Sequence, residues 1–254
     1  MDKILLENIN NSIDNNTDNN IDNSTNNSID NTIEHKYGDD DKYEPWMDNN
    51  IFFPIATKMI DPLIKLKITP NQVTYMSTIF VFLAIYFIHI DKNIYAGISY
   101  FFGYLLDCID GRMARKYNLM SNYGMALDLT SDNISNYCLF IYLIYKYGIT
   151  NYYIIFLLIL SIGLSLQFGF NEAIVCYKKS GHDNFYKVKV EMLKNNDEFI
   201  YKLYLFIIKT SYETYRLFFP TYNEENIKKW LSLLREFGPG NYVLIVIIVL
   251  MIIK

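Results

Sequence analysis

Four aspartates between Asp107 and Asp132 stand at spacings that could build a metal site. Asp107 and Asp110 are three residues apart, and Asp128 and Asp132 are four apart. On α-helices, both spacings place the two carboxylates of a pair on one face. Two such helices facing each other would offer the oxygen ligands that Mg²⁺, Mn²⁺ and Ca²⁺ prefer. The stretch therefore predicts two helices that hold divalent cations between them.

The residues between the two pairs favour a phosphate-containing ligand at the same site. Gly111 directly follows the first pair, and we expect it to end the first helix, whereas Gly124 lies near the start of the second. With Ala114, these small residues would let a nucleotide approach the backbone closely. Arg115 supplies a fixed positive charge for phosphate or for helix pairing. The alternative, that the aspartates are only solvated helix ends, explains neither their spacing nor these neighbours.

The whole pattern, D-x2-D-G-x2-A-R-x8-G-x3-D-x3-D, resembles the signature of the CDP-alcohol phosphotransferases, the class-I CDP-alcohol phosphatidyltransferases. All eight of its fixed positions are filled without a departure. Residues 68–74, ITPNQVT, are similar to the TPN-x-x-T motif that precedes the first membrane helix in many members. The resemblance covers residues 68–175 well and is loose after residue 176.

The resemblance implies a role for each position of the pattern. Asp132 would be associated with the metal and would act as the general base. It implies Mg²⁺ or Mn²⁺ as the cofactor, with two ions bound. The implied metal ligands are Asp107, Asp110 and Asp128, and the residues implied to line the CDP site are Gly111, Ala114, Arg115 and Gly124.

The resemblance implies an enzyme of phospholipid synthesis, a transferase of substituted phosphate groups, but it leaves the substrates open. Without its N-terminal tail the chain has the length of the enzymes that use CDP-diacylglycerol, and residues 123–143 look like the matching part of phosphatidylinositol synthases. Inositol is thus the favoured acceptor, and glycerol phosphate and serine are possible in its place. The sequence is also compatible with transfer of a phospho-alcohol from a CDP-alcohol to diacylglycerol, with a catalytically inactive membrane scaffold and with a divalent-cation transporter.

The apolar residues, 51% of the chain, collect in long runs separated by short polar links. This pattern is typical of a polytopic membrane protein. The sequence therefore predicts an all-α membrane protein with about six transmembrane helices, each needing about 20 residues. The candidate spans are residues 73–90, 94–106, 124–145, 152–175, 200–219 and 241–253.

Three regions are predicted along the chain. Residues 1–45 form an acidic, low-complexity tail of Asn, Asp, Ser, Thr and isolated Ile residues, which we expect to be disordered. Residues 46–67 form an amphipathic helix that could lie at the membrane interface, kinked or split at Pro62. Residues 68–254 form the transmembrane catalytic domain. The apolar stripe of the amphipathic helix is expected to be Phe52, Ile55, Met59, Leu63 and Leu66.

The placement of basic residues predicts the orientation of the chain in the membrane. Lys and Arg precede the first span and follow the second and the fourth, whereas the loops after the first and third spans contain only Lys92 and Lys146. The positive-inside rule then places the aspartate stretch on the cytoplasmic face. The expected partners are a CDP-linked lipid or alcohol and membrane lipid, and the chain could assemble as a homodimer. Nothing in the sequence suggests nucleic acid.

Overall fold

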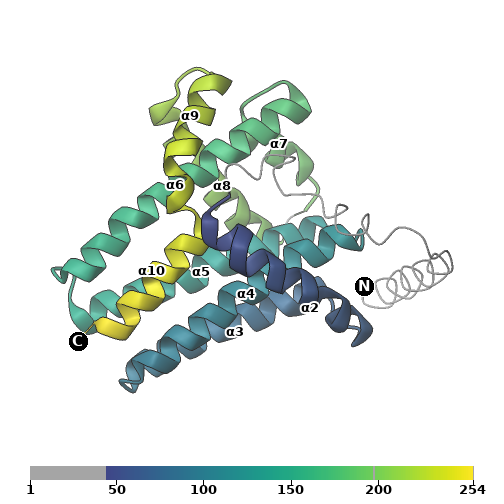
Figure 1. The fold of residues 1–254 in the computed structure, drawn as a ribbon. Coiled ribbons are helices and arrows are strands. Elements are labelled where there is room, and N and C mark those ends of the chain that lie inside the picture. The colour runs from purple at the N-terminus through teal and green to yellow at the C-terminus, as the bar shows by residue number, and fades with distance from the viewer. Residues whose placement is uncertain (1–43, 197, 254) are drawn as a thin grey trace.

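The computed structural model describes residues 44–196 and 198–253, and every regular element within them is helical (Figure 1). The all-α class predicted from the sequence is confirmed. The predicted disordered tail lies outside the described residues, apart from its last two positions. The elements are the π-helical turn η2 (Asp48–Phe52), α2 (Phe53–Lys65), α3 (Pro70–His89), α4 (Asn93–Lys116), α5 (Asn122–Tyr147), α6 (Tyr152–Ser180), α7 (Phe185–Met192), α8 (Phe199–Phe218), α9 (Glu224–Leu234), the 3-10 turn η3 (Arg235–Phe237) and α10 (Pro239–Ile252).

Three segments of the described chain are long and apolar enough to cross a membrane: Pro70–His89, Tyr152–Ser180 and Glu224–Ile252. They contain the first, fourth and last of the predicted spans. The helices that contain the other three predicted spans are less apolar. In α4 and α5 the acidic pairs lower the mean hydropathy of the helix. In α8 it is lowered by the charged residues Lys202, Lys209, Glu213 and Arg216.

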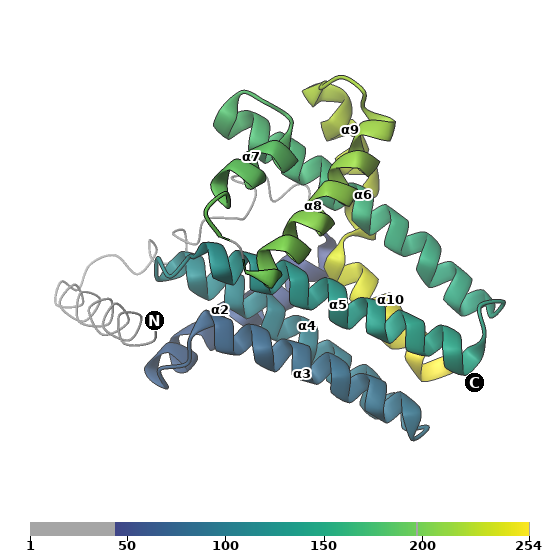
Figure 2. The same cartoon turned by 180° about the vertical axis from the view of Figure 1, so that it is seen from behind.

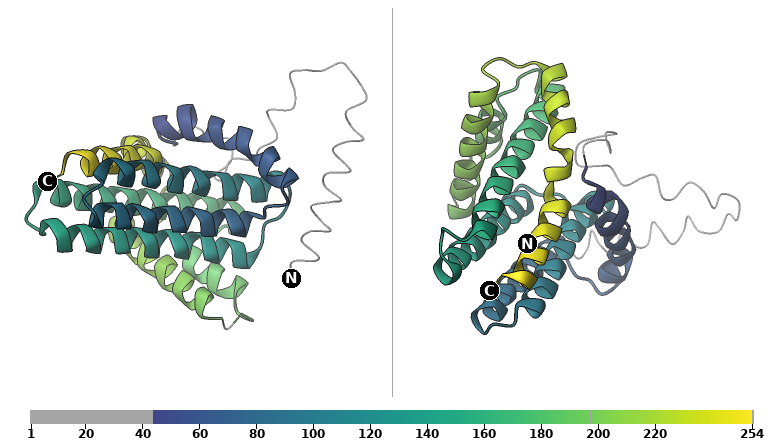
Figure 3. Two further views of the ribbon diagram at one scale, coloured as in Figure 1. Left: turned by 90° about the horizontal axis from the view of Figure 1, so that it is seen from below. Right: turned by 60° about the vertical axis from the view of Figure 1, so that its left-hand side comes forward.

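The helix α3 packs against both α4 and α5, and these three long helices run side by side (Figures 1 and 3). At one end, a capping box between Thr69 and Gln72 begins α3, and Ser121 caps the start of α5. At the other end, Lys146 Nζ lies 2.6 Å from Asp91 Oδ1 in the turn between α3 and α4. The turn after α3 and the end of α5 therefore share one end of the bundle.

The first acidic pair lies inside a helix that is longer than predicted. The helix α4 continues through Gly111 to Lys116, so the prediction that Gly111 ends it is wrong. A glycine inside a helix costs only about 0.5–1 kcal/mol relative to alanine. The burial of Ile109 and Met113, which are both fully inaccessible, more than offsets that cost.

The N-terminal helix α2 packs on α4 with an apolar stripe other than the predicted one. The residues that it and η2 bury are four apart along the sequence: Phe52, Ala56, Ile60 and Ile64. Of the predicted stripe, Ile55, Met59 and Leu66 are exposed. The helix carries two apolar stripes, and the one facing α4 is the stripe whose small Ala56 permits close approach. The helix also runs through Pro62 without being split.

Polar contacts run the length of the α2–α4 seam, which we define as Asp48, Phe53 and Asp61 with their partners Tyr104, Arg112 and Lys116. The Tyr104 hydroxyl donates to Asp48 Oδ1 at 2.7 Å. The Arg112 guanidinium lies 3.7 Å from the centroid of the Phe53 ring. Lys116 Nζ lies 2.5 Å from Asp61 Oδ1. The basic end of α4 is therefore fastened to α2.

The two carboxylates of the seam differ in ionisation because they differ in burial. Burial raises the pKa of Asp48 to about 7, although hydrogen bonds from Tyr104 and from the Gly240 N–H oppose the shift. Burial also acts on the half-exposed Asp61, but hydrogen bonds from Lys116 and Tyr117 outweigh it and hold its pKa below the ordinary value. An aspartate thus has a raised pKa at one end of the seam, which favours its neutral form, and a lowered pKa at the other, which favours its ionised form.

A second, aromatic core lies on the other side of α5 (Figure 2), whereas α10 packs on α4 in the first core. The second half of α6 packs with α7, α8 and α9 around Phe170, Phe185, Tyr204 and Tyr215. Phe170 meets Phe219 edge to face, with the ring centroids 5.2 Å apart. The stretch 221–239 contains the helix α9 and the turn η3, and Ile227 and Leu231 of α9 are buried in this core.

Candidate active site

The acidic site lies between α4 and α5, where the two pairs face each other. The helix α4 carries Asp107 and Asp110, and α5 carries Asp128 and Asp132. One carboxylate oxygen from each of Asp107, Asp110 and Asp128 lies within 4.8 Å of the others. Asp110 is buried, whereas Asp107 and Asp128 are partly accessible. Three converging carboxylates with this spacing fit the oxygen-only ligand set that hard divalent cations take.

The fourth carboxylate, Asp132, stands at the edge of this group. It is not one of the three residues whose oxygens converge, but a side-chain hydrogen bond joins it to Asp107. Its backbone carbonyl accepts a hydrogen bond from the Asn136 amide at 2.8 Å, and Asn136 in turn accepts from the Tyr100 hydroxyl of α4 at 2.8 Å. The segment of α5 from Asp132 to Asn136 is thereby tied to α4 beside the site.

A residue of α3 completes the surroundings of the acidic cluster. The Thr74 hydroxyl lies 2.5 Å from Asp110 Oδ2, and both side chains are buried. Sequence reasoning noticed Thr74 only as part of the TPN-x-x-T motif and assigned it no partner. The position of Thr74 could have indicated this contact. Its hydroxyl lies one turn inside α3, and α3 packs against both acidic helices.

The two glycines of the pattern have different surroundings. A Cβ atom added at Gly124 would lie 3.0 Å from Asn71 Oδ1 and 3.1 Å from Ser121 Oγ, so the packing leaves little room for a side chain. A Cβ added at Gly111 would meet only the Arg115 guanidinium, at 3.4 Å, which is an ordinary contact with a flexible group. Close packing thus demands glycine at position 124 but not at position 111.

The basic residues at the end of α4 point to different places. Arg115 folds back over Gly111, next to the acidic pair. Arg112 is buried against Phe53, and Lys116 pairs with Asp61, so both belong to the α2–α4 seam. The motif residue Arg115 is therefore the basic side chain of this helical end that stays beside the site.

The match to a known family decides what this arrangement is. Residues 67–191 match the CDP-alcohol phosphatidyltransferase family. This segment is a CDP-alcohol phosphatidyltransferase domain. The domain contains α3 to α6 and most of α7, so every position of the sequence pattern lies inside it. The resemblance noted from the sequence is thus confirmed, and the chain is related to phosphatidyltransferases, which transfer substituted phosphate groups.

Several curated relatives are similar to part of the chain. The chain is 33% identical over 99 residues to the CDP-diacylglycerol–inositol 3-phosphatidyltransferase of Schizosaccharomyces pombe, covering 39% of this chain and 40% of that protein. It is 39% identical over 74 residues to the archaetidylinositol phosphate synthase of Pyrococcus horikoshii, covering 29% and 39%. It is 29% identical over 135 residues to the CDP-diacylglycerol–inositol 3-phosphatidyltransferase of Drosophila melanogaster, covering 53% and 54%.

The matched segments span about a third to just over half of the length of the curated relatives. No solved structure matches the chain. The family match covers the helices that carry the acidic cluster, and the helices α8 to α10 lie beyond it.

Proposed function

We propose that the protein transfers a phosphatidyl group from CDP-diacylglycerol to a small alcohol, with inositol favoured, and releases CMP. The observation that carries the proposal is the convergence of three carboxylates from α4 and α5 within a CDP-alcohol phosphatidyltransferase domain. The inositol preference is supported by the relatives, five of which are named as inositol phosphatidyltransferases or as an archaetidylinositol phosphate synthase.

The donor set fits the divalent metal on which this family depends. In the proposed site, Asp107, Asp110 and Asp128 hold Mg²⁺ or Mn²⁺, with two ions bound, and Thr74 orients Asp110 through its hydroxyl. Bound metal would neutralise the diphosphate and the negative charge that develops on the departing CMP. Arg115 would add a fixed positive charge beside the same phosphates, and Gly111, Ala114 and Gly124 would line the CDP site with it.

The proposed general base is Asp132, at the edge of the carboxylate group. Its carboxylate accepts the proton of the acceptor hydroxyl as that oxygen attacks the phosphorus of the phosphatidyl group. The new phosphorus–oxygen bond forms while the bond between this phosphorus and the oxygen of CMP breaks. CMP leaves with the electron pair of the broken bond, so the phosphate group is transferred without any change in oxidation state.

The membrane setting is part of the proposal. The three apolar segments support an integral membrane protein. We propose that α4, α5 and α8 also cross the bilayer, giving six spans in all, because they pack beside the apolar helices. The exposed Ile55, Met59 and Leu66 on α2 support a position of that helix at the interface. The basic end of α4 supports a cytoplasmic active site.

The proposal is tested with the purified full-length chain and labelled CDP-diacylglycerol. Inositol, inositol phosphate, glycerol phosphate and serine are supplied in turn, and CMP release is measured. We expect release with inositol, loss of release in EDTA and recovery with Mg²⁺ or Mn²⁺. The Asp61→Asn variant is the matched control, because it removes a carboxylate outside the site. Full activity in chelator would contradict the metal mechanism, and release only from CDP-choline or CDP-ethanolamine with diacylglycerol would favour phospho-alcohol transfer.

A further inference from the structure

The helix α9 and the turn η3 carry more apolar surface than the described chain covers. Ile227 and Leu231 of α9 are buried in the aromatic core. Trp230 and Leu233 lie three residues apart on a neighbouring face of the helix, and Phe237 follows in η3. The exposed fractions of these three side chains are 45%, 62% and 43%. Large apolar side chains that gather on one face mark a contact with lipid or with another protein.

The exposed face joins the apolar outer side of α6. Phe237 packs at Gly163 of α6, where an added Cβ would lie 3.6 Å from the Phe237 Cβ. Phe156 and Ile159 lie seven and four residues before Gly163, so they share its face of α6, and both are exposed. They belong to one of the three segments that are apolar enough to cross a membrane. In a bilayer, lipid would surround this side of α6 and would reach Phe237 as well.

The length of the chain here sets the depth of this face. A membrane-spanning helix needs about 20 residues. Counted back from Ile252 at the end of α10, such a span begins at Leu233, and counted forward from Tyr152 at the start of α6, it ends at Asn171. Both candidate segments are 29 residues long, so the second half of α6 and the start of α9 extend beyond the apolar core. At ~1.5 Å per residue, Trp230 lies about 4.5 Å beyond Leu233, which is the level of the lipid headgroups.

The residue types change at the same level. Tryptophan is favoured where a membrane meets water, because its ring is apolar and its indole N–H donates a hydrogen bond. The part of α9 before Trp230 is charged, with Glu224, Glu225, Lys228 and Lys229. Lys228 pairs with Glu224 at 2.7 Å, whereas the side chain of Lys229 is exposed beside the tryptophan, where lipid phosphates would attract it. The helix therefore changes from charged to apolar at Trp230.

We propose that α9 enters the bilayer at Trp230, with the indole ring among the lipid headgroups and with Leu233 and Phe237 against the acyl chains. The inference does not depend on which lipid the enzyme makes, and α9 lies beyond the family match. A second copy of the chain or another protein fits this face less well, because the surface of α6 that continues it belongs to a segment apolar enough to span the membrane.

The first test measures the fluorescence of Trp230 in the full-length protein in phosphatidylcholine vesicles. The chain has two tryptophans, so Trp46→Phe leaves Trp230 as the reporter. Bromine on the lipid chains near the headgroup should quench its emission more than bromine near the chain ends, and aqueous iodide should quench it weakly. Strong quenching by iodide alone would place Trp230 in water, and protection from every quencher would place it against protein. Either result, or strongest quenching by the deep bromine, would overturn the proposal.

Glu225 provides the matched control for this measurement. It is exposed and lies five residues before Trp230, so it points to the polar side of α9. A chain that combines Glu225→Trp with Trp46→Phe and Trp230→Phe carries its single tryptophan at this position. Iodide should quench that tryptophan, and brominated lipid should not. The same response at positions 225 and 230 would contradict a membrane boundary between them.

A second measurement leaves both tryptophans in place. A spin label on Leu233→Cys should collide more often with oxygen, which concentrates in lipid, than with a water-soluble nickel complex. A label on Glu225→Cys should show the reverse order. The signal of the labelled protein without the added cysteine is subtracted, because the chain has three cysteines of its own. A preference for nickel at Leu233→Cys would refute the lipid contact, even where the Trp46→Phe protein failed to fold.

Discussion

Carboxylates lie beside α4 in two places, the α2–α4 seam and the acidic site, and their surroundings differ. In the α2–α4 seam each carboxylate accepts hydrogen bonds from donors of the protein: Asp48 from Tyr104 and the Gly240 N–H, and Asp61 from Lys116 and Tyr117. In the acidic site, the oxygens of Asp107, Asp110 and Asp128 lie within 4.8 Å of one another.

The difference teaches how to tell a structural carboxylate from one that binds a cation. Carboxylates that face protein donors are satisfied by the fold, and their removal should cost stability. Carboxylates that face one another repel when ionised, so the fold holds them together at a cost that a divalent cation relieves. The acidic site should therefore lose function when it is altered, and the seam should lose stability.

The largest effect is expected at Asp132. Asp132→Asn keeps the size of the side chain but removes its basicity, so turnover should fall ~10²–10⁴-fold. Donor affinity at saturating Mg²⁺ should stay within a few-fold of wild type. Asp107→Asn should instead weaken both cation binding and turnover. Equal loss of donor binding in the two variants would identify Asp132 as a metal ligand first and would require another proton acceptor.

The next effect concerns Asp48 and the dependence of stability on pH. Its pKa is about 7 in the folded protein, above its ordinary value of 3.8, so the folded state binds its proton more tightly than the unfolded state. Its contribution to stability is full at low pH and is lost as the pH rises toward about 7, by up to a few kcal/mol. The Tm of detergent-solubilised protein, measured between about pH 5 and 8, should fall less in Asp48→Asn than in wild type. The same slope in both proteins would be the contrary result.

A smaller effect is expected at Thr74, which contacts Asp110 from α3. Removing the partner of a metal ligand typically costs about 10- to 100-fold in metal affinity or activity. Thr74→Val should raise the Mg²⁺ concentration needed for half-maximal activity by that range, and Thr74→Ser should restore it. Thr214→Val, which changes an exposed hydroxyl on α8, is the control. A Thr74→Val protein with wild-type Mg²⁺ dependence would separate Thr74 from the site.

The smallest effect is expected at the exposed end of the seam. Asp61→Asn removes the ion pair with Lys116, and solvent-exposed pairs typically contribute about 0.2–1 kcal/mol. Because the pKa of Asp61 is lowered in the folded protein, this stabilisation is present at neutral pH and is lost as the pH falls through the folded pKa. The Tm difference between wild type and variant should shrink in high salt, with CMP release unchanged. A loss of activity would place the seam within the reaction machinery.

Local spacing was enough to predict the helical class and the meeting of the two acidic pairs, because helical periodicity fixes which residues share a face. The extent of α4 was not predictable in that way. Gly111 has the character of a helix end, and only the burial of Ile109 and Met113 by other helices keeps it inside the helix.

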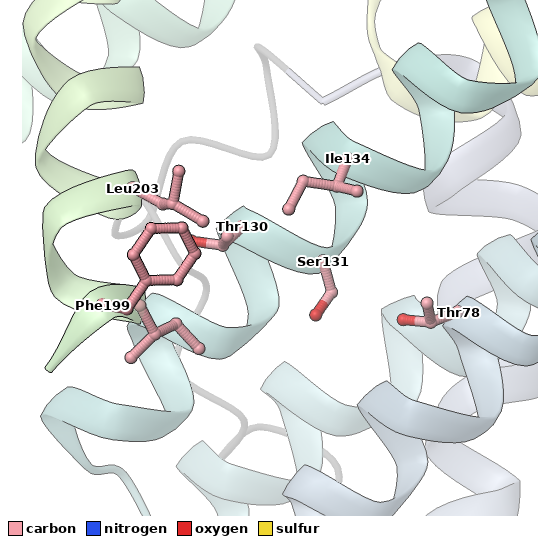
Figure 4. Close-up of a pocket in the computed structure, with 7 residues that line it drawn as sticks. Thr78, Thr130, Ser131, Ile134, Phe199 and Leu203 are labelled. Atoms are coloured by element: carbon pink, nitrogen blue, oxygen red, sulfur yellow. The ribbon is translucent and has the colours of Figure 1, made fainter.

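Contacts between helices far apart in the sequence could not be read from periodicity either. The sequence contains two apolar stripes on α2, and nothing local tells which one meets α4. The partner of Asp110 comes from α3, 36 residues earlier. The pocket between α3, α5 and α8 takes one wall from α8, a helix beyond the family match (Figure 4). Each of these depends on which helices become neighbours in the folded bundle.

The contact between Asp48 and Gly240 has a consequence for the order in which the bundle assembles. The Gly240 N–H, at the start of α10, donates to Asp48 Oδ2 at 2.9 Å across a separation of 192 residues. The Asn241 side chain accepts from the Met47 N–H, and Arg235 Nε donates to the Glu44 carbonyl at 2.9 Å. During synthesis the first partners of these contacts emerge about 190 residues before the second. These three hydrogen bonds therefore form late in folding. Until they form, the start of α10 lacks the carboxylate that accepts from its N–H group.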